Sequence, residues 1–430
     1  MTAAWQAGDT AAAAREFSSK ADKSADKDGV IWHLEAGTAQ RAAGNYEESN
    51  RHFDAADALI DKYEAQARIK VGREAAAIMS NQQNLPYEGR PYDKIMLHTY
   101  KALNYLALNR PDQARPELIR AYQCQQDAVA ENQRRIAKAQ EAESESPNRA
   151  AIERAKSNPQ FSQSVDNLLR PAEGLRSYAD YVNPFTVYLD GLYFLHNAAD
   201  GSDLERASKS MNRALEMAGD NQFVMADAQA GHRSPMPVTY VIFETGHVAS
   251  LEQVRIDIPL FFENLYYVGA AFPKLVIHAD AAPYLTVKTS TAQENTLPIA
   301  SMDAIVAQDF KNQMPVIVTK TLISTIAKAA ASYAVNKTVN NQDNLAGVFT
   351  RLATAVVQIA VNIADTRSWT TLPKDFQVAR ITTPADRQLT ASTPSGATMQ
   401  LTLIDGFANV VYAKSVTANG PLVIHQFKLK

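Results

Sequence analysis

Small and apolar side chains recur at helical spacing through the first half of the chain, and short turn sequences interrupt them. A turn at Gly44 precedes one run, in which Phe53 and Ala56 fall on a single helical face. A turn at Asn109 precedes a second run, in which Leu118 follows at the same interval. Because side chains three or four residues apart share one side of an α-helix, the pattern predicts pairs of packed helices.

The distance between successive turns indicates a structural repeat. Gly8 and Gly44 are 36 residues apart, close to the length of a tetratricopeptide (TPR) unit. Gly44 and Asn109 are 65 residues apart, so we expect a degenerate helical pair between them, at about 60–84. A TPR-like α-solenoid is therefore predicted for residues 1–230.

Two tyrosines next to these turns are candidates for structural or interaction residues. Tyr46 begins the helix that follows Gly44, and Tyr105 lies near the end of the helix that precedes Asn109. In TPR units aromatic side chains fill gaps beside the small residues at which helices cross. We expect both tyrosines on the inner face of the repeat.

A polar, charge-rich stretch interrupts the repeat near residues 125–170. Three glutamates, Glu141, Glu143 and Glu145, precede a Ser-Pro-Asn sequence. The composition predicts a long exposed helix followed by a linker or a mobile loop.

The hydrophobic pattern changes its period after residue 230. Pro235 and Pro237 end helical structure and mark a domain junction, and a β-rich run follows at 238–244. The region 235–430 is predicted to be a mixed α+β domain with two long helices and a strand-rich C-terminus. Further strands are expected at 253–258, 274–278, 284–289, 376–381, 388–391, 399–404, 409–413 and 422–428.

The two long helices are expected at 300–335, where Pro315 breaks or kinks the helix, and at 344–365. The second is the most apolar segment of the chain, and we interpret it as a buried core helix. Arg351 and Asn362 argue against a membrane span, because charged and polar groups at membrane depth are costly. A contact between copies or with a membrane surface is the alternative.

Composition excludes several classes of protein. The chain has 430 residues, of which 46% are hydrophobic and 21% charged, as in folded proteins of two or three domains. A net charge of -3 gives no support to a nucleic-acid surface. Cys124 is the only cysteine, so no intramolecular disulfide can form, and we expect it to be buried as a small apolar residue.

No linear motif for catalysis, cofactor binding or metal binding is present. The eight histidines are scattered without ligand spacing, and neither a glycine-rich phosphate loop nor a nucleophile elbow occurs. We therefore expect no enzyme activity, no cofactor and no metal. The alternative is an enzyme with its site in the C-terminal domain near Glu244 and His247, which lie at the end of a predicted strand.

The most distinctive local string runs from Asp365 to Pro373, Asp-Thr-Arg-Ser-Trp-Thr-Thr-Leu-Pro. We expect Trp369 to plug the seam between helix and sheet. Arg367 is expected to pair with Asp365 or to cap carbonyl groups of the preceding helix. A binding role for the Arg–Trp pair is the alternative.

Four strings, found in order at 100–108, 183–185, 307–311 and 365–373, resemble an uncharacterised family of bacterial TPR-containing envelope proteins. Many of that family carry lipoprotein signal peptides, and the resemblance covers roughly residues 30–425. It implies a periplasmic protein tethered to a membrane through a lipidated N-terminal cysteine. The first helical motif, near Gly8, lacks its first helix, so we expect that the natural N-terminus with this cysteine has been removed.

The sequence thus predicts a non-enzymatic scaffold or assembly protein of the bacterial cell envelope. Its TPR-like surface would bind one or more protein partners, and the C-terminal domain would dock a second partner or self-associate. The alternatives are an envelope enzyme acting on cell-wall material and a structural subunit of a secretion or surface-appendage assembly.

Overall fold

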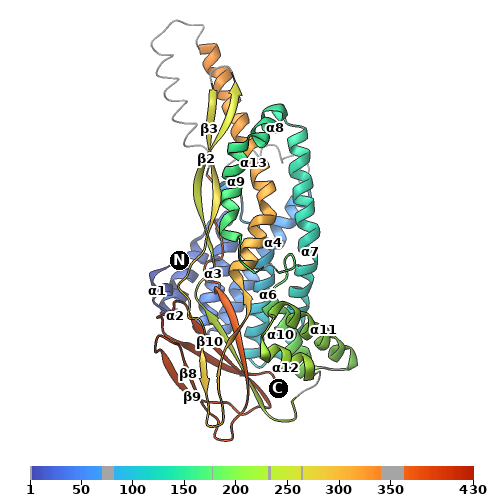
Figure 1. The fold of residues 1–430 in the computed structure, drawn as a ribbon, viewed down its shortest axis with the longest axis vertical. Helices are drawn as coiled ribbons and strands as arrows, with labels where there is room; N and C mark the ends of the chain where they lie inside the picture. The colour runs from blue at the N-terminus through green and yellow to red at the C-terminus, as the bar shows by residue number, and fades with distance from the viewer. Residues whose placement is uncertain (1, 70–81, 177, 231–233, 263–264, 340–362) are drawn as a thin grey trace.

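The chain folds into an elongated molecule, shown by a computed structural model (Figure 1). Helices dominate the first half and strands the second, so the chain is of the mixed α and α+β type. The strand-rich part lies at one end, and a long hairpin and a long helix run toward the other. The described residues are 2–69, 82–176, 178–230, 234–262, 265–339 and 363–430.

The described helices of the first half follow one another along the chain. Their bounds are α1 (Ala3–Gln6), α2 (Thr10–Lys23), α3 (Gly29–Ala42), α4 (Tyr46–Ile69), α6 (Pro91–Ala107), α7 (Pro111–Ser144), α8 (Arg149–Ser157), α9 (Pro159–Leu169), α10 (Pro184–Asn197), α11 (Gly201–Ala218) and α12 (Gln222–Ala230), with short 3-10 turns η1 (Asp26–Asp28), η2 (Gln82–Asn84) and η3 (Arg170–Ala172).

The predicted turns join pairs of packed helices. Gly44, between α3 and α4, has φ 81°, and Asn109, between α6 and α7, has φ 57°. Glycine and asparagine are the residues that adopt this left-handed conformation most readily. Between α10 and α11, the Asp200 carboxylate accepts hydrogen bonds from the first backbone N–H groups of α11. The prediction of helical pairs at these three positions is confirmed.

The side chains expected between the helices are mostly inside the molecule. Tyr46 and Tyr105 are only half-buried. Phe53, Ala56 and Leu118, which follow the two turns, are fully buried.

The polar stretch near 125–170 differs from the expectation after its first helix. Helix α7 continues to Ser144, but the expected linker is instead the helix pair α8 and α9. Ile152 and Phe161 are buried in the main core, and the Phe161 ring lies 6.1 Å from that of Phe272. These two helices bury a narrow apolar face, which the surrounding charged residues obscure in the sequence.

The second half builds three sheets. The largest has the order β11-β10-β1-β7-β6, in which β1 pairs in parallel with β10 and antiparallel with β7. A four-stranded sheet has the order β5-β4-β8-β9, and β2 and β3 form a separate hairpin. The bounds are β1 (Val238–Thr245), β2 (Ser250–Phe262), β3 (Leu265–Val276), β4 (Thr286–Lys288), β5 (Gln293–Asn295), β6 (Leu297–Ser301), β7 (Asp375–Thr382), β8 (Gln388–Ser392), β9 (Thr398–Thr402), β10 (Ala408–Ser415) and β11 (Val423–Lys428).

One long helix of the second half, α13 (Met302–Val339), runs along the β2–β3 hairpin and α7. Pro315 was expected to break or kink the helix, and the structure shows no break, because α13 continues through this residue. Proline removes only one backbone hydrogen bond there, and packing on both sides of it holds the helix. Residues Met302–Ala331 of α13 are apolar enough to cross a membrane by length and composition, but half of the most apolar window is buried inside the protein.

The second predicted helix, at 344–365, falls almost wholly outside the described residues. Its last three residues, 363–365, are described and are not helical.

The described residues form two hydrophobic clusters, and the larger one joins the helical and strand-rich parts. Helix α10 is central to it, since nearly all of its residues are buried. The ring of Phe185 in α10 stacks on that of Phe376 in β7, with 4.0 Å between the centroids and 6° between the planes. The predicted junction at 231–237 thus marks a change of secondary structure within a shared core.

The crossing of α3 and α4 gives a test of this packing. A Cβ added at Gly37 would lie 2.4 Å from the ring of Phe53, so Gly37→Ala should lower the free energy of unfolding by about 1–3 kcal/mol. A Cβ added at Gly201 has no atom within 4 Å, so Gly201→Ala should change it by less than about 0.5 kcal/mol. Urea denaturation measures both, and equal effects would contradict the described crossing.

Candidate functional site

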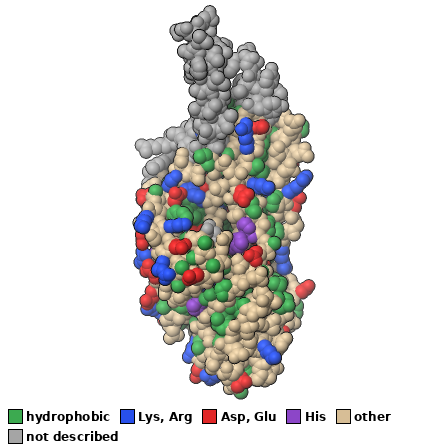
Figure 2. Space-filling model, turned by 90° about the vertical axis from the view of Figure 1, so that its left-hand side faces the viewer, with side chains coloured by type: hydrophobic (Ala, Val, Ile, Leu, Met, Phe, Trp, Pro, Cys, Tyr) green, Lys and Arg blue, Asp and Glu red, His purple; other side chains and the backbone are tan. Residues whose placement is uncertain are grey.

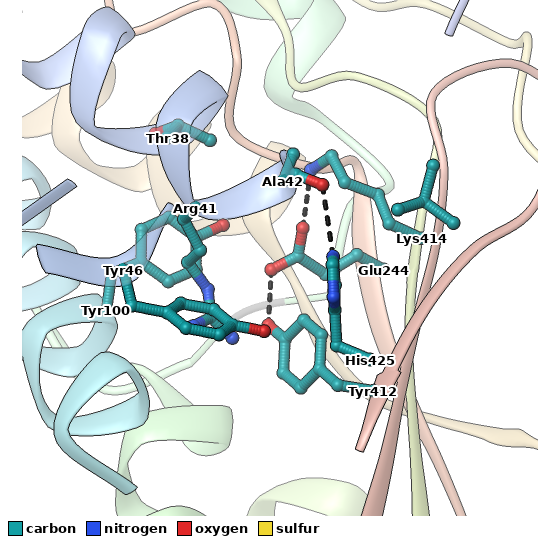
Figure 3. Close-up of a pocket in the computed structure, with 10 residues that line it drawn as sticks. Thr38, Arg41, Ala42, Tyr46, Tyr100, Glu244, Tyr412, Lys414 and His425 are labelled. Carbon is teal, nitrogen blue, oxygen red and sulfur yellow. Dashed lines mark hydrogen bonds and ion pairs between the residues drawn. The ribbon is translucent and has the colours of Figure 1, made fainter. Parts of the chain in front are cut away.

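A small cavity lined by polar and charged side chains lies where the helical part meets the large sheet (Figure 3). Helices α3, α4 and α6 contribute one side, and strands β1, β10 and β11 the other. Its volume is about 20 Å³, which is room for about one water molecule. The lining residues are Thr38, Arg41, Ala42, Tyr46, Tyr100, Glu244, Tyr412, Lys414, Val423 and His425.

A buried carboxylate organises this cavity. Glu244, on β1, accepts hydrogen bonds from the Tyr412 hydroxyl and from the Lys414 ammonium group. The guanidinium group of Arg41, on α3, lies 4.4 Å from the centre of the Tyr412 ring and donates to the side-chain oxygen of Asn104 at 2.8 Å. All of these side chains are buried. One anion and two cations therefore meet at the junction between the two parts of the chain.

Burial and neighbouring charges shift the pKa of several groups in this cavity. Burial alone would raise the pKa of Glu244, but Lys414 and Arg41 outweigh it and hold that pKa below its ordinary value. Burial, together with the Glu244 charge, raises the pKa of Tyr412 well above its usual value. Burial lowers the pKa of His425, whose Nε2 lies 3.1 Å from the backbone oxygen of Ala42.

The structure does not bring Glu244 and His247 into one site. The His247 ring instead lies 4.3 Å from the ring of His278, centre to centre. Burial lowers the pKa of His247, and the nearby His278 lowers it further. These two residues have different neighbours, although they are only three positions apart.

Of the predicted tyrosines, Tyr46 lines the cavity and Tyr105 does not. The Tyr46 ring meets His425 edge-on, with 5.8 Å between the ring centres. Tyr105 packs against the main core from the outer part of α6.

The string that contains Trp369 docks on α3. Its indole Nε1 donates to the hydroxyl groups of Thr38 and Thr371, each at 3.0 Å. The ring lies 5.9 Å from those of Phe53 and Tyr100, so it is buried among the helices of the first half. Trp369 was expected to seal a helix against the sheet, and its place among these helices corrects that expectation. Hydrophobic periodicity does not reveal contacts between segments more than 300 residues apart.

Arg367 anchors the same segment. It makes the predicted ion pair with Asp365, at 2.8 Å, and a second with Asp28, at 2.9 Å. Its guanidinium group also donates to the backbone carbonyls of Lys27 and Leu85. These two carbonyl groups belong to the helical half of the chain.

Glu35 completes this contact. Its carboxylate accepts hydrogen bonds from the backbone N–H groups of Thr370, at 2.8 Å, and Thr371, at 3.0 Å. Burial raises the pKa of Glu35, while these hydrogen bonds act to lower it. Glu35, Thr38 and Arg41 follow at intervals of three along α3, so a single helix binds both the Trp369 segment and the sheet. Glu35 and Arg41 were not identified as site residues from the sequence. The signal that could have identified them is the presence of charged residues within the otherwise apolar run of α3.

No group of three or more His, Cys, Asp or Glu side chains able to hold a metal ion occurs in the described part of the chain. Cys124 is a free thiol, and burial raises its pKa to about 12. It is thus poorly suited to act as a nucleophile.

Comparison of the chain with protein-family models, with curated proteins and with solved structures gave no match.

The Glu244–Lys414 pair gives a stability test. Lys414→Met would leave a buried carboxylate without its closest cation and should lower the free energy of unfolding by about 3–5 kcal/mol. Glu244→Gln combined with Lys414→Met should recover part of this loss. Lys209→Met, which removes an exposed pair with Glu205, is the matched control and should have no measurable effect. If Lys414→Met and Lys209→Met lowered the free energy of unfolding equally, the buried pair would contribute no more to stability than the exposed pair.

The same pair predicts a pH dependence. Since the folded-state pKa of Glu244 is below its unfolded value, its contribution to stability is present above the unfolded pKa and is lost as pH falls through the folded pKa. The difference in stability between wild type and Glu244→Gln should therefore be constant near neutral pH and shrink below about pH 4. Urea denaturation at a series of pH values measures this difference.

Trp369→Ala should lower the free energy of unfolding by about 3–5 kcal/mol, because it removes a large aromatic from the core. Helical and strand-rich parts should then melt together, since the indole belongs to their shared core. Trp369→Phe keeps a ring but removes the two hydrogen bonds, so its loss should be smaller. Circular dichroism and tryptophan fluorescence should report one transition. A helical half that stays folded after the strands melt would contradict this.

Proposed function

We propose that this protein is a non-enzymatic scaffold or assembly protein of the bacterial cell envelope, in which TPR-like helical hairpins bind protein segments. The observation that carries the proposal is the docking of the chain's own segment 363–374 on the helices of the first half. Peptide recognition by helical repeats requires an exposed helical face that presents polar side chains to an extended backbone.

The contacts of this segment have the character of peptide recognition. Glu35 accepts hydrogen bonds from two consecutive backbone N–H groups, and Arg367 donates to two backbone carbonyls. Trp369 enters a pocket among aromatic side chains, as anchor residues of bound peptides do. These contacts support the interpretation of the helical half as a TPR-like unit whose peptide-binding face is occupied in cis.

A second protein must then use another surface. Helix α7 carries an exposed stripe, Tyr122, Gln126 and Val129, spaced at intervals that place them on one helical side. Tyr122 is 37% exposed and Val129 38%, which makes them two of the few large apolar side chains at the described surface. Figure 2 shows the left-hand side of Figure 1, away from α7, where acidic and basic side chains are interspersed with apolar ones. We assign the α7 stripe as the contact surface for a protein partner.

The enzyme alternative has less support. Glu244, its proposed catalytic carboxylate, is held by Lys414 and Tyr412 beside a cavity that admits about one water molecule. A substrate needs far more room, since ligand pockets are typically about 300–1,000 Å³.

The location in the envelope rests on the resemblance of the strings at 100–108, 183–185, 307–311 and 365–373. A periplasmic position and a tether through a lipidated cysteine upstream of this chain belong to the same proposal, as does self-association through the strand-rich part.

Capture from a bacterial envelope extract, with chemical cross-linking, tests the partner surface. Point variants suit this experiment better than deletion of residues 235–430, because the two parts share one core. We expect Tyr122→Ser combined with Val129→Ser to reduce capture of the principal partner at least tenfold. Phe407→Ser removes an apolar side chain of similar exposure, 38%, from the strand-rich end and should leave capture unchanged.

Two results would overturn the proposal. Capture that is equal for wild type and the double variant would exclude the α7 stripe as the contact surface. Release of soluble fragments from purified peptidoglycan by the wild-type protein, abolished by Glu244→Gln in a variant that remains folded, would favour the enzyme.

A further inference from the structure

A second cavity lies away from the junction, between α7, α8, α9 and the middle of α13. Its volume is about 420 Å³, within the range of about 300–1,000 Å³ that is typical of small-molecule sites. Three helices supply most of its apolar lining: Ile136 from α7, Val165 and Leu169 from α9, and Met314, Val316 and Val318 from α13.

The apolar side chains line this space without filling it. Ile136, Val165 and Val316 are each half-buried, although they face one another across a space between packed helices. Burial of apolar surface contributes about 25 cal/mol of favourable free energy for each Å² removed from water, and these side chains do not gain it while they remain exposed to water. A ligand with an apolar body would cover this surface.

The charges around the cavity do not balance. The Lys156 ammonium group is paired with Glu143 at 2.5 Å and donates to the Thr319 hydroxyl at 2.9 Å. Lys311, which also lines the cavity, has no carboxylate within ion-pair distance among the described residues. One positive charge at an apolar cavity is therefore left without a counter-charge.

Pro315 adds a feature to the same wall. It has no N–H group, so it cannot donate the helical hydrogen bond to the carbonyl of Lys311, four residues earlier. The carbonyl group of Lys311 thus lacks its usual helical donor, and both Lys311 and Pro315 line the cavity.

We propose that this cavity binds a single-chain anionic amphiphile. The acyl chain would lie against α7, α9 and α13, and the anionic head would pair with the Lys311 ammonium group. The head chemistry is an oxyanion, either the carboxylate of a fatty acid or the phosphate of a lysophospholipid. A small polar ligand fits less well, because most of the wall offers no hydrogen-bonding group. This inference is independent of the partner surface on α7.

Isothermal titration calorimetry on the full chain tests the proposal with three probes below their micellar concentrations. These are dodecanoate, 1-lauroyl-lysophosphatidylglycerol and dodecanol. We expect binding of at least one anionic probe, with a dissociation constant about tenfold higher in Lys311→Met. Dodecanol, which has no charge, should bind weakly and equally to wild type and Lys311→Met. Lys209→Met on α11, which removes a lysine distant from the cavity, should change nothing.

Specific binding inside the cavity can be distinguished from adsorption to the protein surface with two variants. Each variant narrows the cavity from a different helix. Val316→Trp on α13 and Val165→Phe on α9 should each abolish binding of all three probes, and thermal melting identifies any variant that does not fold. The relative affinities of the two anionic probes distinguish a fatty acid from a lysophospholipid.

The proposal is overturned if no anionic probe binds the wild type, or if binding survives in folded variants of both helices. Equal weakening of dodecanoate and dodecanol by Lys311→Met would overturn the assignment of the anionic head to Lys311.

Discussion

The structure depends on one face of α3, which places a carboxylate, a hydroxyl and a guanidinium group inside the protein. The carboxylate of Glu35 needs the backbone N–H groups of the Trp369 segment. The guanidinium group of Arg41 needs the Tyr412 side chain and the carboxylate of Glu244. A buried charge without partners is costly, whereas the same charge with hydrogen bonds is tolerated. The helical part therefore requires the strand-rich part at this surface. This is a stronger constraint than apolar contact alone, because polar groups tolerate little displacement.

The same surface of the helical part binds a segment of its own chain. An extended segment of the chain lies across it, anchored by an ion-paired arginine, a buried indole and two backbone hydrogen bonds. Binding in cis loses less translational and rotational entropy than binding a separate peptide, so moderate contacts suffice to keep the segment in place. The scaffold that we propose would hold its own strand-rich part by this means and leave its outer helices for other proteins.

Local features of the fold could be predicted from the sequence, and long-range ones could not. Gly44 and Asn109 identified helical turns because a left-handed backbone restricts the residue type. The strands at 238–245 and 408–415 were recognisable from their apolar runs, but their parallel pairing was not, since periodicity carries no partner information. Strand β6 was missed because it passes directly into α13. Of the site, Trp369 and Arg367 stood out as an unusual string, while their partners on α3 looked like ordinary helix residues.

Because the chain is synthesised from its N-terminus, the parallel pairing of β1 and β10 affects how the protein can fold. These strands are joined by some 160 residues of intervening chain, and β11, which completes the sheet, follows β10. His425 in β11 reaches the carbonyl of Ala42 at the end of α3. During synthesis the first helices emerge long before the strands that cover them, and non-local pairings of this kind form slowly. The growing chain must therefore hold α3 with its polar face in water until β10 and β11 have been made, so the first helices are open to chaperones throughout the synthesis of the chain between them.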